Sequence, residues 1–213
     1  TGSRAVTAAG QRIAIALTIA GSDSSGGAGI QADLKTFSAF GVYGACAITA
    51  LTAQNSLGVA GIHPVPPEFV AAQIEAVLAD LRVGAVKTGM LADAAIVEAV
   101  AAALARRPEI PVVVDPVMVA TSGDVLLQHE AVAVVRERLL PRATLLTPNL
   151  PEAARLLGRP TARDEAEMAE QGHALVAMGA RAVLIKGGHG DGPLAVDVLV
   201  EGHRVSRLEA VRV

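Results

Sequence analysis

The sequence predicts an α/β fold, in which a mainly parallel sheet lies between two layers of helices as a three-layer sandwich. Short apolar runs alternate with helical patterns along the 213 residues, and this order requires helical crossovers between parallel strands. The runs are almost purely apolar, as expected of strands that are buried on both faces. Polar and glycine-rich groups follow most of the runs, at the carboxyl ends where such sheets bind ligands. A chain of this length is expected to form one domain, which we place at residues 13–213.

In the first half of the chain, strands are predicted at residues 13–19, 44–52, 59–65 and 85–90. The third is short and stops at two prolines, so we expect it at an edge. Helices between the strands have apolar residues at helical spacing. The first carries Ile30, Leu34 and Phe37 and stops near Gly41. The second begins at Pro67, and its inward stripe is Phe69, Gln73, Ile74, Val77, Leu78 and Leu81. The third follows an Asp93 cap to about residue 106, and its inward residues are Ile96, Val97, Val100 and Leu104.

The second half continues the alternation. Residues 111–115 are the clearest buried strand, a β-branched run that ends in Asp115. Two more strands are expected at 144–147 and 182–186, and a final hairpin at 195–200 and 203–208. Helices are expected at 130–140, 152–157 and 164–178. Residues 116–124 contain Ser122-Gly123 and are predicted to form a mobile loop.

The composition disfavours several classes of protein. Aromatic residues make up 2% of the chain and the net charge is −3 without a basic stripe, so no nucleic-acid partner is expected. No apolar run reaches the roughly 18 residues of a membrane span. The one cysteine, Cys46, permits no intramolecular disulfide and fits a reducing cytoplasm; its apolar surroundings predict a buried, inert thiol. Residues 1–12 lack a signal-peptide pattern and are expected to be a disordered leader.

A glycine-rich stretch, AGSDSSGGAGIQADLK at residues 20–35, joins the first strand to the first helix. Its glycines allow the backbone to approach a ligand closely, because no Cβ intervenes. The free N–H groups at the helix start favour an anion or a polar ring edge. The alternative is a tight turn without a function, capped by Asp23 or a serine.

Charged residues at three other strand ends suggest phosphoryl transfer. Asp115 and Glu152 are carboxylates that could hold Mg²⁺, directly or through water. Lys186 precedes two glycines, and an ammonium group beside open backbone N–H groups suits phosphate oxygens. Phosphoryl transfer depends mainly on such positioning and charge neutralisation. The chain has neither a Gly-x-x-x-x-Gly-Lys-Ser/Thr loop nor a Gly-x-Ser-x-Gly turn, which excludes a P-loop enzyme and the familiar serine-hydrolase turn.

Each of these residues has a structural alternative. Asp115 before Pro116 could form a turn, Glu152 could be a first-turn helix acid, and Lys186 could be a solvated strand end. Gln54 could only tie down its loop. Among the scattered histidines, His189 is a candidate phosphate or nucleotide contact.

Blocks of sequence at these positions resemble the hydroxymethylpyrimidine/phosphomethylpyrimidine kinases of thiamine biosynthesis, in the ribokinase-like superfamily. The blocks are residues 20–37, 48–55, 87–91, 114–118, 146–153 and 184–189, so the likeness extends from about Ile13 to the end. The resemblance implies a ribokinase-like domain that uses ATP and Mg²⁺ to phosphorylate 4-amino-5-hydroxymethyl-2-methylpyrimidine, and then its monophosphate to the diphosphate. It further implies a cytoplasmic homodimer without a membrane partner.

The resemblance also implies roles for individual residues. Gln54 matches the glutamine that hydrogen-bonds the pyrimidine, and an amide offers that ring both a donor and an acceptor. Other positions around the pyrimidine are Gly21, Ala28, Asp33, Met90 and Val117. The ATP side comprises Asp115, Asn149, Glu152, Lys186 and Gly188, with Asp115 and Glu152 near Mg²⁺ and Lys186 as the catalytic group that neutralises phosphate charge. The glycine turn would therefore line the acceptor pocket and not the ATP phosphates.

One departure keeps other functions open. The family carries a later Gly-Thr-Gly-Cys block, whose N–H groups form an anion hole and whose cysteine lies at the position of the catalytic base. Residues 1–213 contain no such block, and Cys46 is not that cysteine because its context differs. We therefore expect a domain that lacks its C-terminal catalytic block. A pyridoxal kinase, whose ring is similar, and a non-catalytic, truncated form that binds the pyrimidine are the alternatives.

Overall fold

The computed structural model describes residues 13–118, 129–188 and 194–211. The predicted leader at residues 1–12, most of the loop predicted at 116–124, and His189 lie outside the described residues.

The main sheet contains eight strands in the order β10-β9-β8-β7-β6-β5-β1-β2. Six are parallel: β1 (Ile15–Ala20), β2 (Tyr43–Ile48), β5 (Ala85–Thr88), β6 (Val112–Val114), β7 (Leu145–Leu146) and β8 (Ala182–Ile185). The antiparallel hairpin of β9 (Leu194–Glu201) and β10 (Arg204–Val211) extends one edge. The mainly parallel α/β sheet and the closing hairpin are confirmed, and all parallel strands end at one edge of the sheet.

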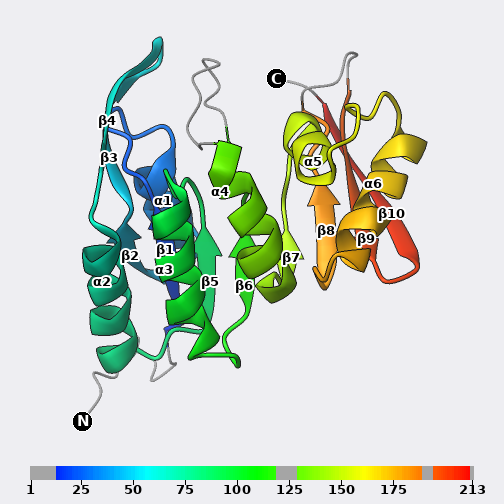
Figure 1. The fold of residues 1–213 in the computed structure, drawn as a ribbon. Coiled ribbons are helices and arrows are strands. Elements are labelled where there is room, and N and C mark those ends of the chain that lie inside the picture. The colour runs from blue at the N-terminus through cyan, green and yellow to red at the C-terminus, as the bar shows by residue number, and fades with distance from the viewer. Residues whose placement is uncertain (1–12, 119–128, 189–193, 212–213) are drawn as a thin grey trace.

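Two further strands form a separate small sheet that projects beyond the main one (Figure 1). They are β3 (Ala50–Asn55) and β4 (Gly58–Pro64), paired antiparallel. The prediction of one strand over 44–52 was therefore wrong, and so was the expectation that 59–65 lies at an edge of the main sheet. The break lies at Thr49, whose N–H donates to Ala20 O and whose hydroxyl donates to Met90 O at 2.6 Å. The first bond continues the pairing with β1, and the second ties Thr49 to the segment after β5, from where the chain leaves the main sheet.

The helices begin and end close to the predicted positions. They are α1 (Gly29–Ala39), α2 (Pro67–Asp80), α3 (Ala94–Ala105), α4 (His129–Val134), α5 (Leu150–Leu157) and α6 (Glu165–Ala177). The predicted Asp93 cap is confirmed, because its carboxylate accepts the N–H of Ile96 at 2.9 Å. After α4 the chain continues as a π-helical turn over Val135–Leu139 and a 3₁₀ turn over Leu140–Arg142. In the parts of the chain that are described, no helix has the length and apolar character to cross a membrane.

Helices lie on both faces of the sheet, as predicted. The larger core lies on the face of Leu17, Val86 and Val183, which all belong to the buried apolar cluster together with residues of α2, α3 and α6. On the other face α1 packs against β1 and β2, where a Cβ at Gly44 would meet the side chains of Leu34 and Phe37. Figure 1 shows α1 behind the sheet and α3 in front of it. The sheet is thus the middle layer, and its carboxyl edge is free to carry a site.

Two predictions of burial need correction or refinement. Phe69, predicted to point inward from α2, is 60% exposed. The rest of the apolar stripe is confirmed, because Ile74 is fully buried and Val77, Leu78 and Leu81 pack against the core. Val70, which is fully buried, takes the inward place expected of Phe69. Cys46 is half-buried, and burial raises the pKa of its thiol, which disfavours the reactive thiolate as expected of an inert cysteine.

Candidate active site

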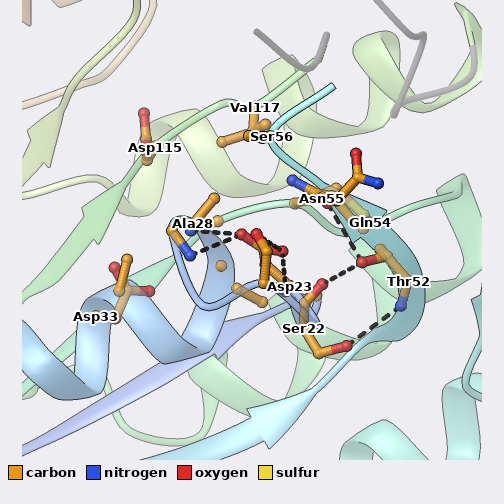
Figure 2. A pocket seen from close by; sticks show the side chains of 18 of the residues that line it. Ser22, Asp23, Ala28, Asp33, Thr52, Gln54, Asn55, Ser56, Asp115 and Val117 are labelled. Atoms are coloured by element: carbon orange, nitrogen blue, oxygen red, sulfur yellow. Dashed lines mark hydrogen bonds between the residues drawn. The ribbon is translucent and has the colours of Figure 1, made fainter. Parts of the chain in front are cut away.

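A cavity of about 500 Å³ opens at the carboxyl edge of the parallel strands. Its walls come from the glycine-rich turn, the start of α1, the small sheet, and the ends of β5 and β6. In the view of Figure 2, Asp33 and Asp115 lie on one side of the cavity and Gln54 and Asn55 on the opposite side. All six residues that the resemblance places around a pyrimidine line it: Gly21, Ala28, Asp33, Gln54, Met90 and Val117. Asp115 lines it as well.

The glycine-rich turn is shaped by the buried carboxylate of Asp23. Its oxygens accept the backbone N–H groups of Ser25, Gly27 and Ala28 at 2.7–2.9 Å, and the Ser25 hydroxyl at 2.8 Å. Burial opposes the charge on Asp23, but these hydrogen bonds outweigh burial and lower the pKa of the carboxyl below 3.8. The turn's anion site is therefore filled from within the chain. This leaves the turn to line the cavity without binding an external phosphate through those N–H groups.

The small sheet is fastened to the same turn. Ser24 Oγ and the backbone of Gln54 exchange two hydrogen bonds, at 2.7 and 2.9 Å. The Thr52 N–H donates to Ser22 Oγ at 3.2 Å, and the Thr52 hydroxyl lies 2.8 Å from Ser22 O and 3.3 Å from Gln54 Oε1 (Figure 2). The backbone of Gln54 thus ties down the loop, while its side-chain amide faces the cavity.

Opposite Gln54, charges of alternating sign form what we call the charged row: Asp33, Lys87, Asp115 and Lys186. Lys87 Nζ lies 3.0 Å from Asp33 Oδ2 and 4.0 Å from Asp115 Oδ2. Lys186 Nζ lies 2.8 Å from Asp115 Oδ1. Since these residues come from α1 and from the ends of β5, β6 and β8, the row crosses the sheet from the cavity toward α5.

At the far end of the row, Asn149 and Glu152 form a capping box at the start of α5. Asn149 Oδ1 accepts the N–H of Glu152 at 2.9 Å, and Glu152 Oε2 accepts the N–H of Asn149 at 2.8 Å. Burial raises the pKa of Glu152 to about 7, against the lowering effects of the Asn149 N–H and the Lys186 ammonium. The charge of Asp115 also contributes to raising the pKa of Glu152, which places this carboxyl within electrostatic reach of the charged row.

The donor set fits a magnesium ion held mainly by phosphate and water. Among the described residues no three acidic, histidine or cysteine side chains gather as a metal cluster. Mg²⁺ commonly takes only one or two protein carboxylates beside substrate phosphates. Asp115 and Glu152 can supply these, and a cation would favour the charged form of Glu152.

Sequence reasoning found most of these residues but not their connections. Gln54 and Asp115 both line the cavity, and Lys186 pairs with Asp115. Glu152 lies within electrostatic reach of Asp115, and Gly188 is exposed after β8. Asp23 was expected only as the cap of a turn without a function, and its role as the internal anion of a turn that lines the cavity was not foreseen. Thr18, whose hydroxyl donates to Asp33 Oδ2 at 2.6 Å, was missed. A polar residue inside the otherwise apolar first strand was the available signal for Thr18.

Comparison with known proteins gives a consistent result. The family model of phosphomethylpyrimidine kinase matches residues 23–213. The hydroxymethylpyrimidine/phosphomethylpyrimidine kinase of Escherichia coli K12 is 57% identical over 198 residues, which cover 93% of this chain and 74% of that protein. The crystal structure of phosphomethylpyrimidine kinase from Clostridium difficile 630 is 44% identical with a TM-score of 0.84, covering 91% of this chain and 83% of that chain. An ADP complex of Bacillus subtilis pyridoxal kinase is 40% identical with a TM-score of 0.86, covering 94% and 76%.

Proposed function

The chain belongs to the phosphomethylpyrimidine kinase family, and on that premise we propose that it phosphorylates 4-amino-5-hydroxymethyl-2-methylpyrimidine for thiamine biosynthesis. ATP is the phosphoryl donor. The first transfer is to the hydroxymethyl oxygen, and the second is to the phosphate of the resulting monophosphate. The observation that carries the proposal is the cavity itself, in which an amide and apolar side chains face a row of charges that leads away along the strand ends.

The pyrimidine is proposed to bind between Gln54 and the apolar side chains of Met90 and Val117. The amide of Gln54 supplies a donor and an acceptor to the aminopyrimidine edge. Met90 and Val117 cover the faces of the ring, and Gly21 and Ala28 leave space for it. This arrangement points the hydroxymethyl group toward the charged row, where the phosphoryl group must arrive.

The ATP phosphates are proposed to lie on the side of Asp115, Asn149, Glu152, Lys186 and Gly188. The ammonium of Lys186 neutralises charge on the phosphoryl group, which is the main task of a protein in such a transfer. When bound, Mg²⁺ would be held by Asp115 and, through water, by Glu152, and would supply further charge neutralisation. Glu152 keeps its carboxylate aimed at this place through its hydrogen bond with Asn149.

Binding and turnover should be measured separately, because residues 1–213 contain no Gly-Thr-Gly-Cys block. Calorimetry with the pyrimidine tests the acceptor site, and a coupled assay tests whether ADP forms only when the pyrimidine is present. Binding with pyrimidine-dependent ADP formation is the expected result. Binding without turnover would instead support a non-catalytic pyrimidine-binding form. If neither the pyrimidine nor its monophosphate binds, the proposal is wrong.

A pyridoxal kinase is the second candidate, favoured by the likeness to the Bacillus subtilis pyridoxal kinase. The identity to that enzyme is 40%, against 57% to the Escherichia coli pyrimidine kinase. The ratio of kcat/KM for the pyrimidine and for pyridoxal decides between them, and a preference for pyridoxal would reverse the assignment.

We also propose a cytoplasmic homodimer. The small sheet exposes apolar side chains that a partner copy could cover, namely Leu51, Leu57 and Ile62. Light scattering on the purified protein measures the mass directly, and a monomer at micromolar concentration would contradict the dimer.

A further inference from the structure

We infer that Lys87 enables the cavity to accept an acceptor that already carries a phosphate group. The inference rests on the proposed function, because the pyrimidine of the first transfer is neutral and its monophosphate in the second transfer is an anion. One pocket must therefore bind two acceptors of very different charge.

The cavity is otherwise unsuited to an anion. Among the described residues that line it, Lys87 is the only lysine or arginine, whereas Asp23, Asp33 and Asp115 are acidic. Asp23 is surrounded by hydrogen-bond donors of its own turn. Asp33 and Asp115 border the charged side of the cavity, and like charges at close range repel strongly where water is partly excluded. Without a cation between them, these two carboxylates would reject a phosphate.

Lys87 lies between the two carboxylates with hydrogen-bonding capacity to spare. Its ammonium donates to Asp33 Oδ2 at 3.0 Å, but it is 4.0 Å from Asp115 Oδ2, beyond hydrogen-bond distance. An ammonium group has three donors on a flexible stem. Its side chain is 23% exposed, so it is partly shielded from water and still accessible from the cavity.

The backbone leaves room for this ammonium group. A Cβ at Gly89 would lie 3.1 Å from Lys87 Nζ and 2.9 Å from the Cβ of Ala20. Because Gly89 has no side chain, the ammonium group of Lys87 can lie next to it at the cavity wall. Lys186 cannot take this part, since it does not line the cavity and lies on the other side of Asp115.

The alternative is that Lys87 only neutralises Asp33 and Asp115 and has no contact with the acceptor. The two cases differ in their effect on selectivity. Removal of a lysine that only neutralises the carboxylates would leave Asp33 to repel the monophosphate, and neutralising Asp33 as well would restore the wild-type preference, since Asp115 keeps its salt bridge with Lys186. Removal of a lysine that contacts phosphate would weaken binding of the monophosphate far more than binding of the neutral pyrimidine, whether or not Asp33 is neutral.

The test measures, by calorimetry without nucleotide, the Kd of the pyrimidine and the Kd of its monophosphate. For Lys87→Met we expect binding of the monophosphate to weaken by about 10- to 100-fold, as for the loss of a charge-assisted hydrogen bond. Binding of the pyrimidine should change by less than about threefold on the same reasoning, because a neutral ligand makes no such bond. The readout is the ratio of the two constants, in which a general disturbance of the pyrimidine site cancels.

A double variant, Asp33→Asn with Lys87→Met, removes both charges and keeps the shapes. It provides the test if Lys87→Met alone fails to fold, because no unpaired carboxylate is left at Asp33. We expect the double variant to keep the low affinity for the monophosphate relative to the pyrimidine. An equal loss for both ligands in Lys87→Met, or a wild-type ratio in the double variant, would overturn the inference. Failure of the wild-type protein to bind either ligand would instead contradict the proposed function.

Discussion

The ammonium group of Lys186 lies 2.8 Å from Asp115 Oδ1, so that a salt bridge joins the ends of β8 and β6 across the intervening β7. The hydroxyl of Thr147, directly after β7, lies 3.2 Å from the same oxygen. Three neighbouring strands therefore hold one carboxylate in place. The sheet thus fixes the position of Asp115 through these strand ends.

We predict that Lys186→Met weakens ATP binding at least about tenfold, as expected for the loss of a charge-assisted contact to phosphate. The free energy of unfolding should fall by no more than about 1 kcal/mol, since partly exposed ion pairs contribute little; the Lys186 side chain is 37% exposed. Calorimetry with ATP and urea unfolding measure the two effects. The control is Arg163→Met, which breaks an exposed pair with Glu167 away from the cavity and should leave ATP binding unchanged. Equal ATP affinity of Lys186→Met and wild type would remove Lys186 from the nucleotide site.

Much of the fold could be predicted because its strands are buried and bounded by clear signals. The run PVVVD at residues 111–115 predicted β6, and Asp93 predicted the start of α3. The small sheet was missed because residues 44–52 are uniformly apolar or small, and nothing local marks the break at Thr49. That break depends on a hydrogen bond to Met90 O, 41 residues away in sequence. Such a tertiary contact leaves no periodic pattern.

The residues of the site could be predicted from the sequence, but the hydrogen bonds and ion pairs between them could not. Strand ends brought Gln54, Asp115 and Lys186 to one edge, as the parallel topology requires. The pairing of Lys87 with Asp33 could not be foreseen, because the two residues are 54 positions apart and lie on different elements. The sequence of the glycine turn also indicates a site for an external anion. In the structure the carboxylate of Asp23 accepts the N–H groups of that site instead.

Stability is predicted to depend on pH through Asp23. Its pKa is lowered in the folded protein, so the carboxylate contributes stability above its ordinary pKa of 3.8, and that contribution is lost as the pH falls through the folded value. Asp23→Asn should reduce the free energy of unfolding by about 1–3 kcal/mol at pH 7, because an amide nitrogen then faces backbone N–H donors.

Urea unfolding at several pH values between 7 and 3 measures this effect. The difference between wild type and Asp23→Asn should begin to shrink as the pH falls below 3.8, because the unfolded chain then takes up a proton that the folded carboxylate still resists. Asp93→Asn is the matched control, since asparagine caps a helix about as well as aspartate; it should change stability little. A difference at Asp23 that stays constant with pH would contradict the role of its charge.

We predict that Gln54→Ala weakens pyrimidine binding by roughly 1–3 kcal/mol through the loss of a buried hydrogen bond. The structure separates this effect from folding, because the backbone of Gln54, which the variant retains, makes the bonds to Ser24. Calorimetry with the pyrimidine measures the loss. The control is Gln73→Ala: this glutamine bonds the N–H and the carbonyl of Ile48, each at 3.0 Å, and does not line the cavity. Its loss should lower stability and spare binding, whereas unchanged affinity in Gln54→Ala would exclude that residue from the pocket.

The start of α1 is predicted to require glycine for a steric reason. Gly29 has a φ of +57°, and a Cβ there would collide with the carbonyl oxygen of Gly21, which accepts the N–H of Ile30 at 3.0 Å. Gly29→Ala should therefore cost more than the 1–2 kcal/mol of a left-handed residue alone, by roughly a further 1–3 kcal/mol for the backbone that must shift. Gly41→Ala is the control at the other end of the helix. Gly41 has a φ of +69° but no atom within 4 Å of its added Cβ, so this variant should show the conformational cost alone. Urea unfolding of both variants isolates the energetic cost of the collision as the difference between their stability losses.

Gly29→Ala should also weaken pyrimidine binding, because the backbone of Gly21 lines the cavity; Gly41→Ala should leave binding unchanged. Equal losses of stability in the two variants would show that the contact with Gly21 does not restrict the turn.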